Sequence, residues 1–182
     1  MKKLVDLEKA GFVVNNKFRK DWTGSKKIFL RKSVANALIR AKKLLPKGYN
    51  FEIHDGKRSV EDQRKIIKIC EEDFKNKYPG SWKERLVIFT GGYKSLTQKI
   101  PKHTHRHGGA VDLTILNKKG RQLNMGGRKF NESSYLNYYE RRKNLTEKEK
   151  VVRKNRRLLK KVMKKAGFIE NPYEWHHWGF GR

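Results

Sequence analysis

The chain has 182 residues and carries 46 Lys and Arg against 18 Asp and Glu, for a formal net charge of +28 at pH 7. Its length suits a single domain, residues 1–182, with one hydrophobic core. No apolar run approaches the ~20 residues of a membrane span, and the single cysteine excludes a disulfide framework and a multi-cysteine zinc site. Asp6 and Glu8 interrupt any apolar signal-peptide core, so we expect a cytoplasmic protein.

Apolar residues at helical spacing predict three helices. Their ranges are 33–45, 59–74 and 146–166. The second and third begin with capping-box patterns at Ser59 and Thr146. Cys70 falls on the inner stripe of the second helix, where we interpret it as a small core residue.

Short β-rich runs predict strands between these helices. They lie at 51–55, 110–115, 168–169 and 176–180. A further apolar run at 86–89 fits either a strand or the end of a helix. Helices and short strands in this order predict an α+β domain in which helices pack on an antiparallel sheet. We interpret Trp175 and Trp178 as core residues of this domain.

A dense basic segment coincides with the third helix. Residues 141–165 hold 13 basic and 2 acidic side chains, while apolar residues recur at helical spacing. Two interpretations stay open: an amphipathic helix with a solvated basic face, or a surface that binds anionic polymers by counterion release. No P-loop or paired Cys/His finger accompanies the segment.

Five of the six histidines fall into two clusters that suggest a metal site. In the first cluster, His105 stands seven positions before Asp112, with two glycines between them. A glycine turn can bring His105 beside Asp112 on the following strand. His103 and His107 alternate with His105 and would share its face on an extended segment, so a shifted or additional ligand stays open.

The second cluster lies near the C-terminus. His177 follows Glu174 by three residues and can supply a third ligand, while the Glu174 carboxylate points at a metal-bound water. Three protein ligands and one open position are typical of a catalytic zinc site. A carboxylate beside such a water can act as a general base. His176 should point away from His177 on a strand, so we interpret it as a packing residue or a support for a ligand.

Three motifs together resemble those of the zinc D-Ala-D-Ala peptidases, and most closely the vancomycin-resistance-type D-Ala-D-Ala dipeptidases. Residues 105–114, HRHGGAVDLT, resemble the family pattern S-x-H-x-x-G-x-A-x-D-L-T. Residues 174–178, EWHHW, resemble E-W-x-H, and residues 55–59, DGKRS, resemble D-x-Y-R-P. The resemblance runs from about residue 20 to the C-terminus.

This resemblance implies a small α+β fold with an antiparallel sheet under helices. It also implies one Zn²⁺ per chain, held by His105, Asp112 and His177. Glu174 would then act as general base and acid, and Arg58 would stabilise the developing oxyanion.

The chain departs from the family pattern at three places. His103 replaces the serine two positions before the first ligand, and residues 55–59 lack the family's tyrosine and proline. Asn131 follows Phe130 where the family has an aspartate that helps to hold a free peptide amine. A neutral amide cannot form the ion pair that an ammonium group favours.

We therefore expect a zinc-dependent D-Ala-D-Ala dipeptidase that turns over a cell-wall precursor or its fragment. One alternative keeps the metal site but acts on peptidoglycan stem peptides, as a D,D-carboxypeptidase or endopeptidase that is exported or associated with the wall by another route. A second alternative is a zinc-stabilised domain that binds anionic polymers through its basic surface. Glu174 argues against the latter, because a structural zinc site needs no base.

Overall fold

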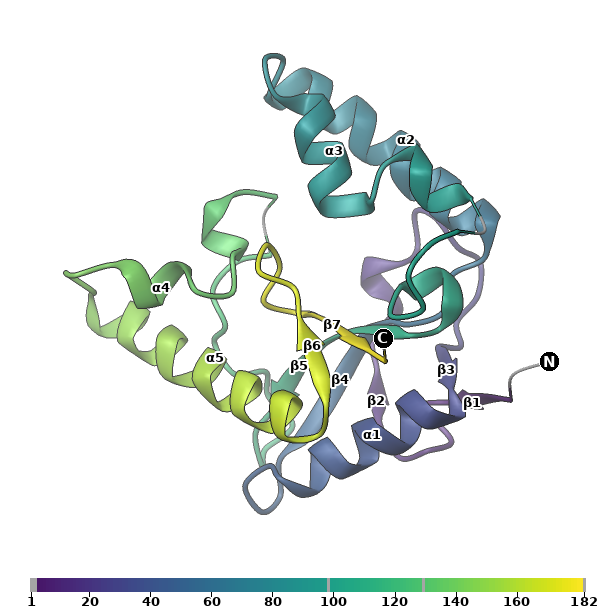
Figure 1. The fold of residues 1–182 in the computed structure, drawn as a ribbon. Coiled ribbons are helices and arrows are strands. Elements are labelled where there is room, and N and C mark those ends of the chain that lie inside the picture. Colours follow the sequence, from purple (N-terminus) through teal and green to yellow (C-terminus); the bar gives the residue numbers. More distant parts are fainter. Residues whose placement is uncertain (1–2, 98, 129, 182) are drawn as a thin grey trace.

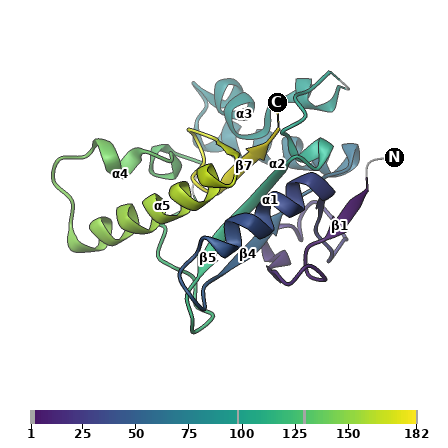
Figure 2. The same ribbon diagram turned by 60° about the horizontal axis from the view of Figure 1, so that its bottom comes forward.

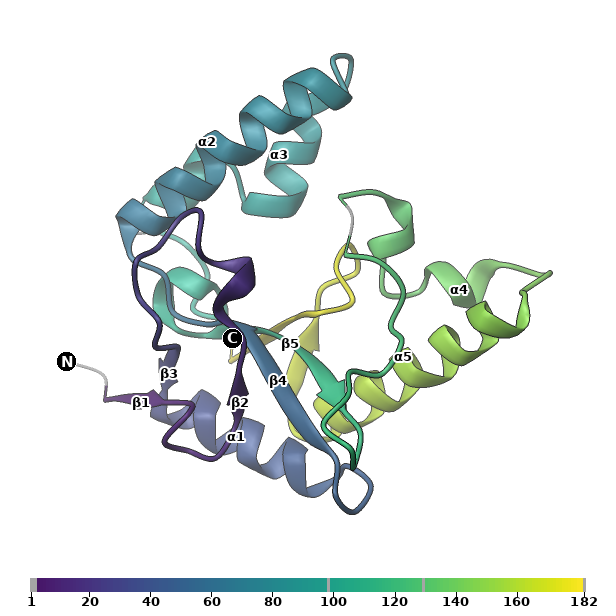
Figure 3. The ribbon, with the colours of Figure 1, turned by 180° about the vertical axis from the view of Figure 1, so that it is seen from behind.

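A five-stranded mixed sheet forms the centre of the computed structural model, which describes residues 3–97, 99–128 and 130–181 (Figure 1). Its strand order is β2 (Val13–Val14), β4 (Asn50–Asp55), β5 (Ala110–Leu116), β7 (His177–Phe180) and β6 (Phe168–Glu170). β2 runs parallel to β4 at one edge (Figure 3), and the other neighbours are antiparallel. A separate two-stranded sheet pairs β1 (Leu4–Asp6) with β3 (Phe29–Arg31).

Two helices cover one face of the central sheet. These are α1 (Lys32–Lys43) and α5 (Glu147–Lys165), which lie side by side against β4 and β5 (Figure 2). A second pair, α2 (Val60–Lys77) and α3 (Trp82–Thr90), packs on itself and projects away from that layer (Figure 1). The short α4 (Tyr138–Arg141) precedes α5.

The predicted α+β class and its main elements are confirmed. The predicted capping boxes are present, with Ser59 accepting from Asp62 N and Thr146 accepting from Glu149 N. The apolar run 86–89 is the end of α3 rather than a strand. The short strands β1, β2 and β3 were not predicted, because two or three residues are too few to show an alternating pattern. The parallel pairing of β2 also departs from the antiparallel sheet that we expected.

Alternation along the strands separates an apolar face from a polar one. Side chains of β4, β5 and β7 contribute to the main core together with α1 and α5; they are Phe51, Ile53, Val111, Leu113, Ile115 and Trp178. The intervening positions carry polar side chains that are nonetheless buried; they are Glu52, His54, Asp112 and Thr114. The polar face, away from α1 and α5, therefore concentrates titratable groups in two neighbouring strands, β4 and β5.

The α2–α3 pair has its own apolar cluster. Its buried members are Ile66, Ile67, Cys70, Phe74 and Leu86. Cys70 is 6% exposed, which confirms its interpretation as a core residue. Trp175 and Trp178 are likewise buried in the main core, as predicted. Among the described residues, no helix is both long enough and apolar enough to cross a membrane.

One basic residue of the third predicted helix is part of the core rather than of the basic face. Arg156 on α5 is 3% exposed. Its guanidinium donates to the carbonyl oxygens of Met125, Tyr135 and Ser133, each at 2.8 Å. Burial lowers the pKa of Arg156 to about 10. This side chain therefore ties the chain at Met125, Ser133 and Tyr135, after β5, to the helix layer.

Replacing Arg156 should destabilise the protein strongly. An Arg156→Met variant leaves three buried carbonyl groups without their donor, and we expect a loss of about 3 kcal/mol in the free energy of unfolding. That loss corresponds to a fall of roughly 10 °C in Tm. Thermal and urea unfolding measure it, with Lys161→Met on the exposed side of α5 as the matched control. Equal effects of the two substitutions would contradict the assignment.

Candidate metal and catalytic site

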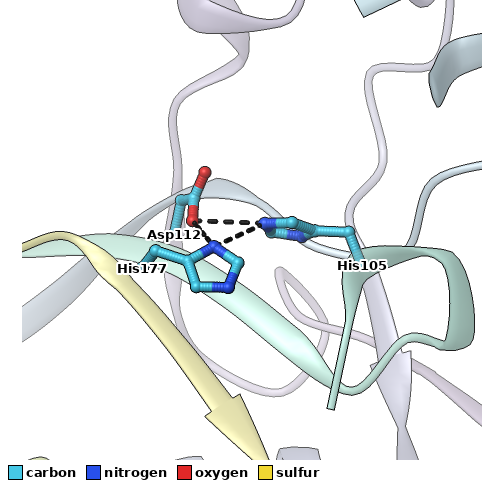
Figure 4. Close-up of side chains that lie close together, drawn as sticks. All are labelled: His105, Asp112 and His177. Atoms are coloured by element: carbon cyan, nitrogen blue, oxygen red, sulfur yellow. Dashed lines mark hydrogen bonds and ion pairs between the residues drawn. The ribbon is translucent and has the colours of Figure 1, made fainter. Parts of the chain in front are cut away.

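Three side chains from different segments converge at one point on the polar face (Figure 4). His105 Nε2 lies 3.2 Å from Asp112 Oδ1 and 3.1 Å from His177 Nδ1. The remaining pair, His177 Nδ1 and Asp112 Oδ1, is 3.0 Å apart. Among the described residues, this is the group of histidine, cysteine and acidic side chains that could hold a metal ion.

Strand pairing and a tight turn bring these residues together. Asp112 on β5 lies directly opposite His177 on β7 in the antiparallel register. His105 lies in a 3-10 turn (His105–His107) that ends at Gly108, where φ is +62°. A Cβ atom at Gly109 would lie 1.9 Å from the carbonyl oxygen of Lys102, so only glycine fits there. The glycine turn of the sequence prediction therefore carries the chain from His105 into β5.

A hydrogen bond to the backbone fixes the orientation of the His105 ring. His105 Nδ1 lies 2.7 Å from the carbonyl oxygen of Gly56. Because a carbonyl can only accept, Nδ1 donates to it, which leaves Nε2 as the nitrogen that faces the centre. Such a backbone partner is the usual support for a metal-binding histidine.

The donor set fits zinc. Ligand atoms of a tetrahedral zinc at about 2.0–2.2 Å stand roughly 3.3 Å apart, close to the observed separations of 3.0–3.2 Å. Burial alone would raise the pKa of Asp112, but His105 and His177 hold it well below its usual range. Two imidazole nitrogens and an ionised carboxylate oxygen thus face one point, where a shared cation satisfies all three.

Glu174 lies in the same cavity as these three residues. The cavity has a volume of about 340 Å³ and is also lined by Arg58. Glu174 Oε2 accepts from Asn171 Nδ2 at 3.1 Å. Burial raises the pKa of Glu174 to about 7, and the negative charge of Asp112 adds to this against the opposing effect of His177, Arg58 and Arg128. A carboxyl group that titrates near neutral pH is suited to take up and release a proton.

Arg58 is fixed beside the centre by two side chains. Its Nε donates to Asp55 Oδ2 at 2.7 Å, and its Nη1 donates to Gln63 Oε1 at 3.1 Å. Its Nη2 lies 3.9 Å from Asp112 Oδ2. Asp55 also pairs with the buried Arg19 at 3.1 Å. A register shift between Ile53 and Asp55 sets Asp55 opposite Asp112, so an irregularity in β4 re-aims the residue that holds Arg58.

The other histidines lie outside the converging group. His105 and His107 belong to a 3-10 turn, so the shared face of an extended segment does not form. His103 lines the same cavity. His176 is buried, and its Nε2 lies 3.5 Å from Glu174 Oε1. This contact agrees with a supporting position for His176.

Sequence reasoning missed two residues of the polar face. Arg128 Nη2 lies 4.0 Å from Asp112 Oδ2, and Arg128 Nη1 also contacts Nδ1 of His54. His54 stands alone in the sequence, and Arg128 is one of 46 basic residues, so neither carries a local signal. Only the unusual burial of a histidine on an alternating strand could have singled out His54.

Two imidazoles and a carboxylate around one point, with a carboxyl group and a guanidinium in the same cavity, are the architecture of a metallohydrolase. The sequence comparison gives the family. The chain matches the peptidase M15 family, described as D-Ala-D-Ala dipeptidase, over residues 6–181. It therefore belongs to this family of peptidases, as its motifs predicted.

A curated relative and a solved structure agree with this assignment. The D-alanyl-D-alanine dipeptidase of Synechocystis sp. is 31% identical over 83 residues, which cover 42% of this chain and 34% of that protein. The match thus spans about a third of the relative's length. The vancomycin-resistance D,D-pentapeptidase VanY, solved in complex with Zn(II), has a similar fold, with a TM-score of 0.51 and 14% identity. That similarity covers 94% of this chain and 80% of the VanY chain.

Removing one imidazole should weaken metal binding strongly. We expect His105→Ala to weaken zinc affinity by at least about 100-fold, since two ligands remain. His103→Ala and His107→Ala should bind zinc within about 3-fold of the parent. Zinc titration followed by thermal unfolding checks this, because a ligand that binds the folded state raises Tm. Retention of zinc by His105→Ala, or its loss in His107→Ala, would overturn the ligand set.

Proposed function

We propose that this chain is a zinc-dependent peptidase that hydrolyses the bond between two D-alanine residues, with His105, Asp112 and His177 as metal ligands. The observation that carries the proposal is the convergence of three donor atoms at 3.0–3.2 Å in the cavity that Glu174 and Arg58 also line. Family membership supports the reaction, and the Zn(II) complex of VanY supports the metal. Zinc, when bound, would polarise the scissile carbonyl and lower the pKa of a water molecule.

Glu174 moves the proton in this proposal. Its carboxylate takes a proton from the attacking water while the water oxygen forms a bond to the carbonyl carbon. The C–N bond then breaks, and Glu174 returns the proton to the leaving amine. Its buried environment and its pKa of about 7 suit both halves of this transfer.

Arg58 stabilises the negative charge that develops on the carbonyl oxygen. Its hydrogen bonds to Asp55 and Gln63 fix the guanidinium before substrate arrives. A fixed donor in a site from which water is largely excluded needs no reorganisation during the reaction. Asp55, which also pairs with Arg19, acts here as a positioning residue.

A second candidate substrate is a longer peptide ending in D-Ala-D-Ala. The family is described as D-Ala-D-Ala dipeptidase, and a free dipeptide carries an ammonium group, but Asn131 gives no negative charge for it. The Asn131 side-chain oxygen already accepts from the backbone and hydroxyl groups of Ser133, at 3.1 and 2.6 Å. This observation supports D,D-carboxypeptidase activity as the alternative.

Product analysis with zinc-loaded protein tests the reaction. Free D-Ala-D-Ala and an amine-blocked peptide ending in D-Ala-D-Ala are offered side by side, and release of D-Ala is measured. We expect Glu174→Gln to lower kcat by about 10²–10⁴-fold because the general base is lost, with zinc content unchanged. Cleavage of neither peptide, or activity of Glu174→Gln close to that of the parent, would reject the proposed mechanism.

We further propose that the surface of α1 and α5 binds an anionic phosphodiester polymer of the cell wall. The sequence has no acidic residue from 32 to 48 or from 150 to 166. Exposed cations on these segments include Arg40, Lys43, Lys154, Lys161 and Lys165. They cover the helical layer on the sheet face opposite the catalytic cavity. Phosphate groups would displace condensed counterions from such a surface, so binding should be strongly salt-dependent.

Charge reversal on matched surfaces tests this contact. The triple variant Lys154→Glu, Lys161→Glu, Lys165→Glu should bind glycerol-phosphate teichoic acid at least about 10-fold more weakly than the parent. The control triple variant Arg64→Glu, Lys65→Glu, Lys68→Glu makes the same charge change on α2 and should lose less than about 3-fold. Equal losses in both variants, or affinity that does not fall with salt, would reject the assigned surface. Tighter binding of a DNA duplex than of teichoic acid would reject the assigned polymer.

A further inference from the structure

A second guanidinium approaches the metal ligand Asp112 from the side opposite the imidazoles. Asp112 Oδ1 faces His105 and His177, whereas Oδ2 faces Arg58 Nη2 at 3.9 Å and Arg128 Nη2 at 4.0 Å. The Arg128 side chain is 18% exposed. The polar face therefore presents two cations beside the carboxylate, of which Arg58 alone belongs to the recognised motifs.

A buried hydrogen-bonded relay holds Arg128 in place. Its Nη1 donates to His54 Nδ1. Since a guanidinium only donates, Nδ1 is the acceptor, and the proton of His54 sits on Nε2, which donates to Glu52 Oε1 at 2.7 Å. Glu52 Oε1 accepts further bonds from Asn15 at 3.1 Å and Gln122 at 2.6 Å. Arg128 is thus a positioned cation rather than a surface side chain that samples many rotamers.

Arg128 also lines a second cavity, of about 570 Å³, between α2 and the segment that follows β5. Ile69, Tyr78 and Phe130 supply apolar and aromatic walls. The one acidic residue among its described lining residues, Asp73, pairs with Lys77 at 2.6 Å. The described lining therefore has a net charge of +1, from Arg128 and Lys77 against Asp73. Asp112 lines the catalytic cavity, and Arg128 lines the second cavity. Since Arg128 Nη2 lies 4.0 Å from Asp112 Oδ2, the two cavities approach each other at Arg128.

We propose that Arg128 and this second cavity form a specificity subsite for a carboxylate on the acyl portion of the substrate, and that the subsite disfavours a free ammonium group there. This inference rests on the proposed peptidase function and names its substrate class: acylated peptides with an acidic group near the scissile bond. A guanidinium recognises a carboxylate with two parallel hydrogen bonds. The same charge repels an ammonium group, which gives discrimination by repulsion as well as by attraction.

Binding to the zinc-loaded Glu174→Gln protein tests the subsite without requiring turnover. Three probes differ only at the amine: free D-Ala-D-Ala, its N-acetyl derivative and its N-succinyl derivative. Calorimetry should rank their affinities succinyl, then acetyl, then free dipeptide. Adding Arg128→Gln should lower the affinity for the succinyl probe by at least about 10-fold and the affinity for the acetyl probe by less than about 3-fold. Arg128→Lys, which keeps the charge but loses the planar fork, should fall between them.

Arg121→Gln is the matched control, because it makes the same charge change in the exposed turn after β5. It should leave all three affinities within about 2-fold of the parent. Tightest binding of the free dipeptide, or equal weakening of all three probes by Arg128→Gln, would overturn the proposal. If Arg128→Gln does not fold, the affinity ranking of the three probes and the affinities of the Arg128→Lys variant still test the subsite. Absence of hydrolysis by the zinc-loaded parent would reject the peptidase function, whereas the binding ranking decides the subsite independently.

Discussion

The structure depends on the burial of one ionised carboxylate, that of Asp112, in the middle of the sheet. A buried charge is costly unless it is paired on every side. Here one oxygen faces two imidazole nitrogens and the other faces two guanidinium groups. Removing any of these neighbours leaves part of the charge uncompensated, at a cost of about 3–5 kcal/mol for a buried pair. The neighbours of Asp112 are therefore constrained by electrostatics before any catalytic requirement is considered.

Each neighbour of Asp112 is itself held by a further polar contact. The Gly56 carbonyl fixes the tautomer of His105, and Asp55 fixes the guanidinium of Arg58. Glu52 and His54 do the same for Arg128 through a hydrogen-bonded relay. Such layered support holds reacting groups in a productive geometry before substrate binds. Both guanidinium groups face the same oxygen of Asp112, at 3.9 Å for Arg58 and 4.0 Å for Arg128.

The large positive charge serves different ends in different parts of the molecule. Arg156 is buried and donates to the carbonyl groups of Met125, Ser133 and Tyr135, so it stabilises the interior rather than a surface. Arg128 and Asn131, which line the second cavity, lie between Met125 and Tyr135 in the sequence. Exposed lysines on α1 and α5, in contrast, lie on the far side of the sheet. The net charge of the chain thus adds together basic residues in the core, at the site and on the surface.

The sequence by itself determined the α+β class, the capped helices, and the residues His105, Asp112, His177, Glu174 and Arg58 as candidates for one site. Helical spacing, glycine turns and closely spaced histidines and carboxylates predict all of these except Arg58, which the family resemblance alone implied. Only the tertiary structure decided that Arg128 meets His54, 74 residues earlier in the chain, and that Arg156 is buried. Arginine gives no periodic signal, and its long side chain can reach solvent or the core from the same backbone position. Which of the two occurs depends on distant segments that bury it, and that contact is set by how the helices and strands pack.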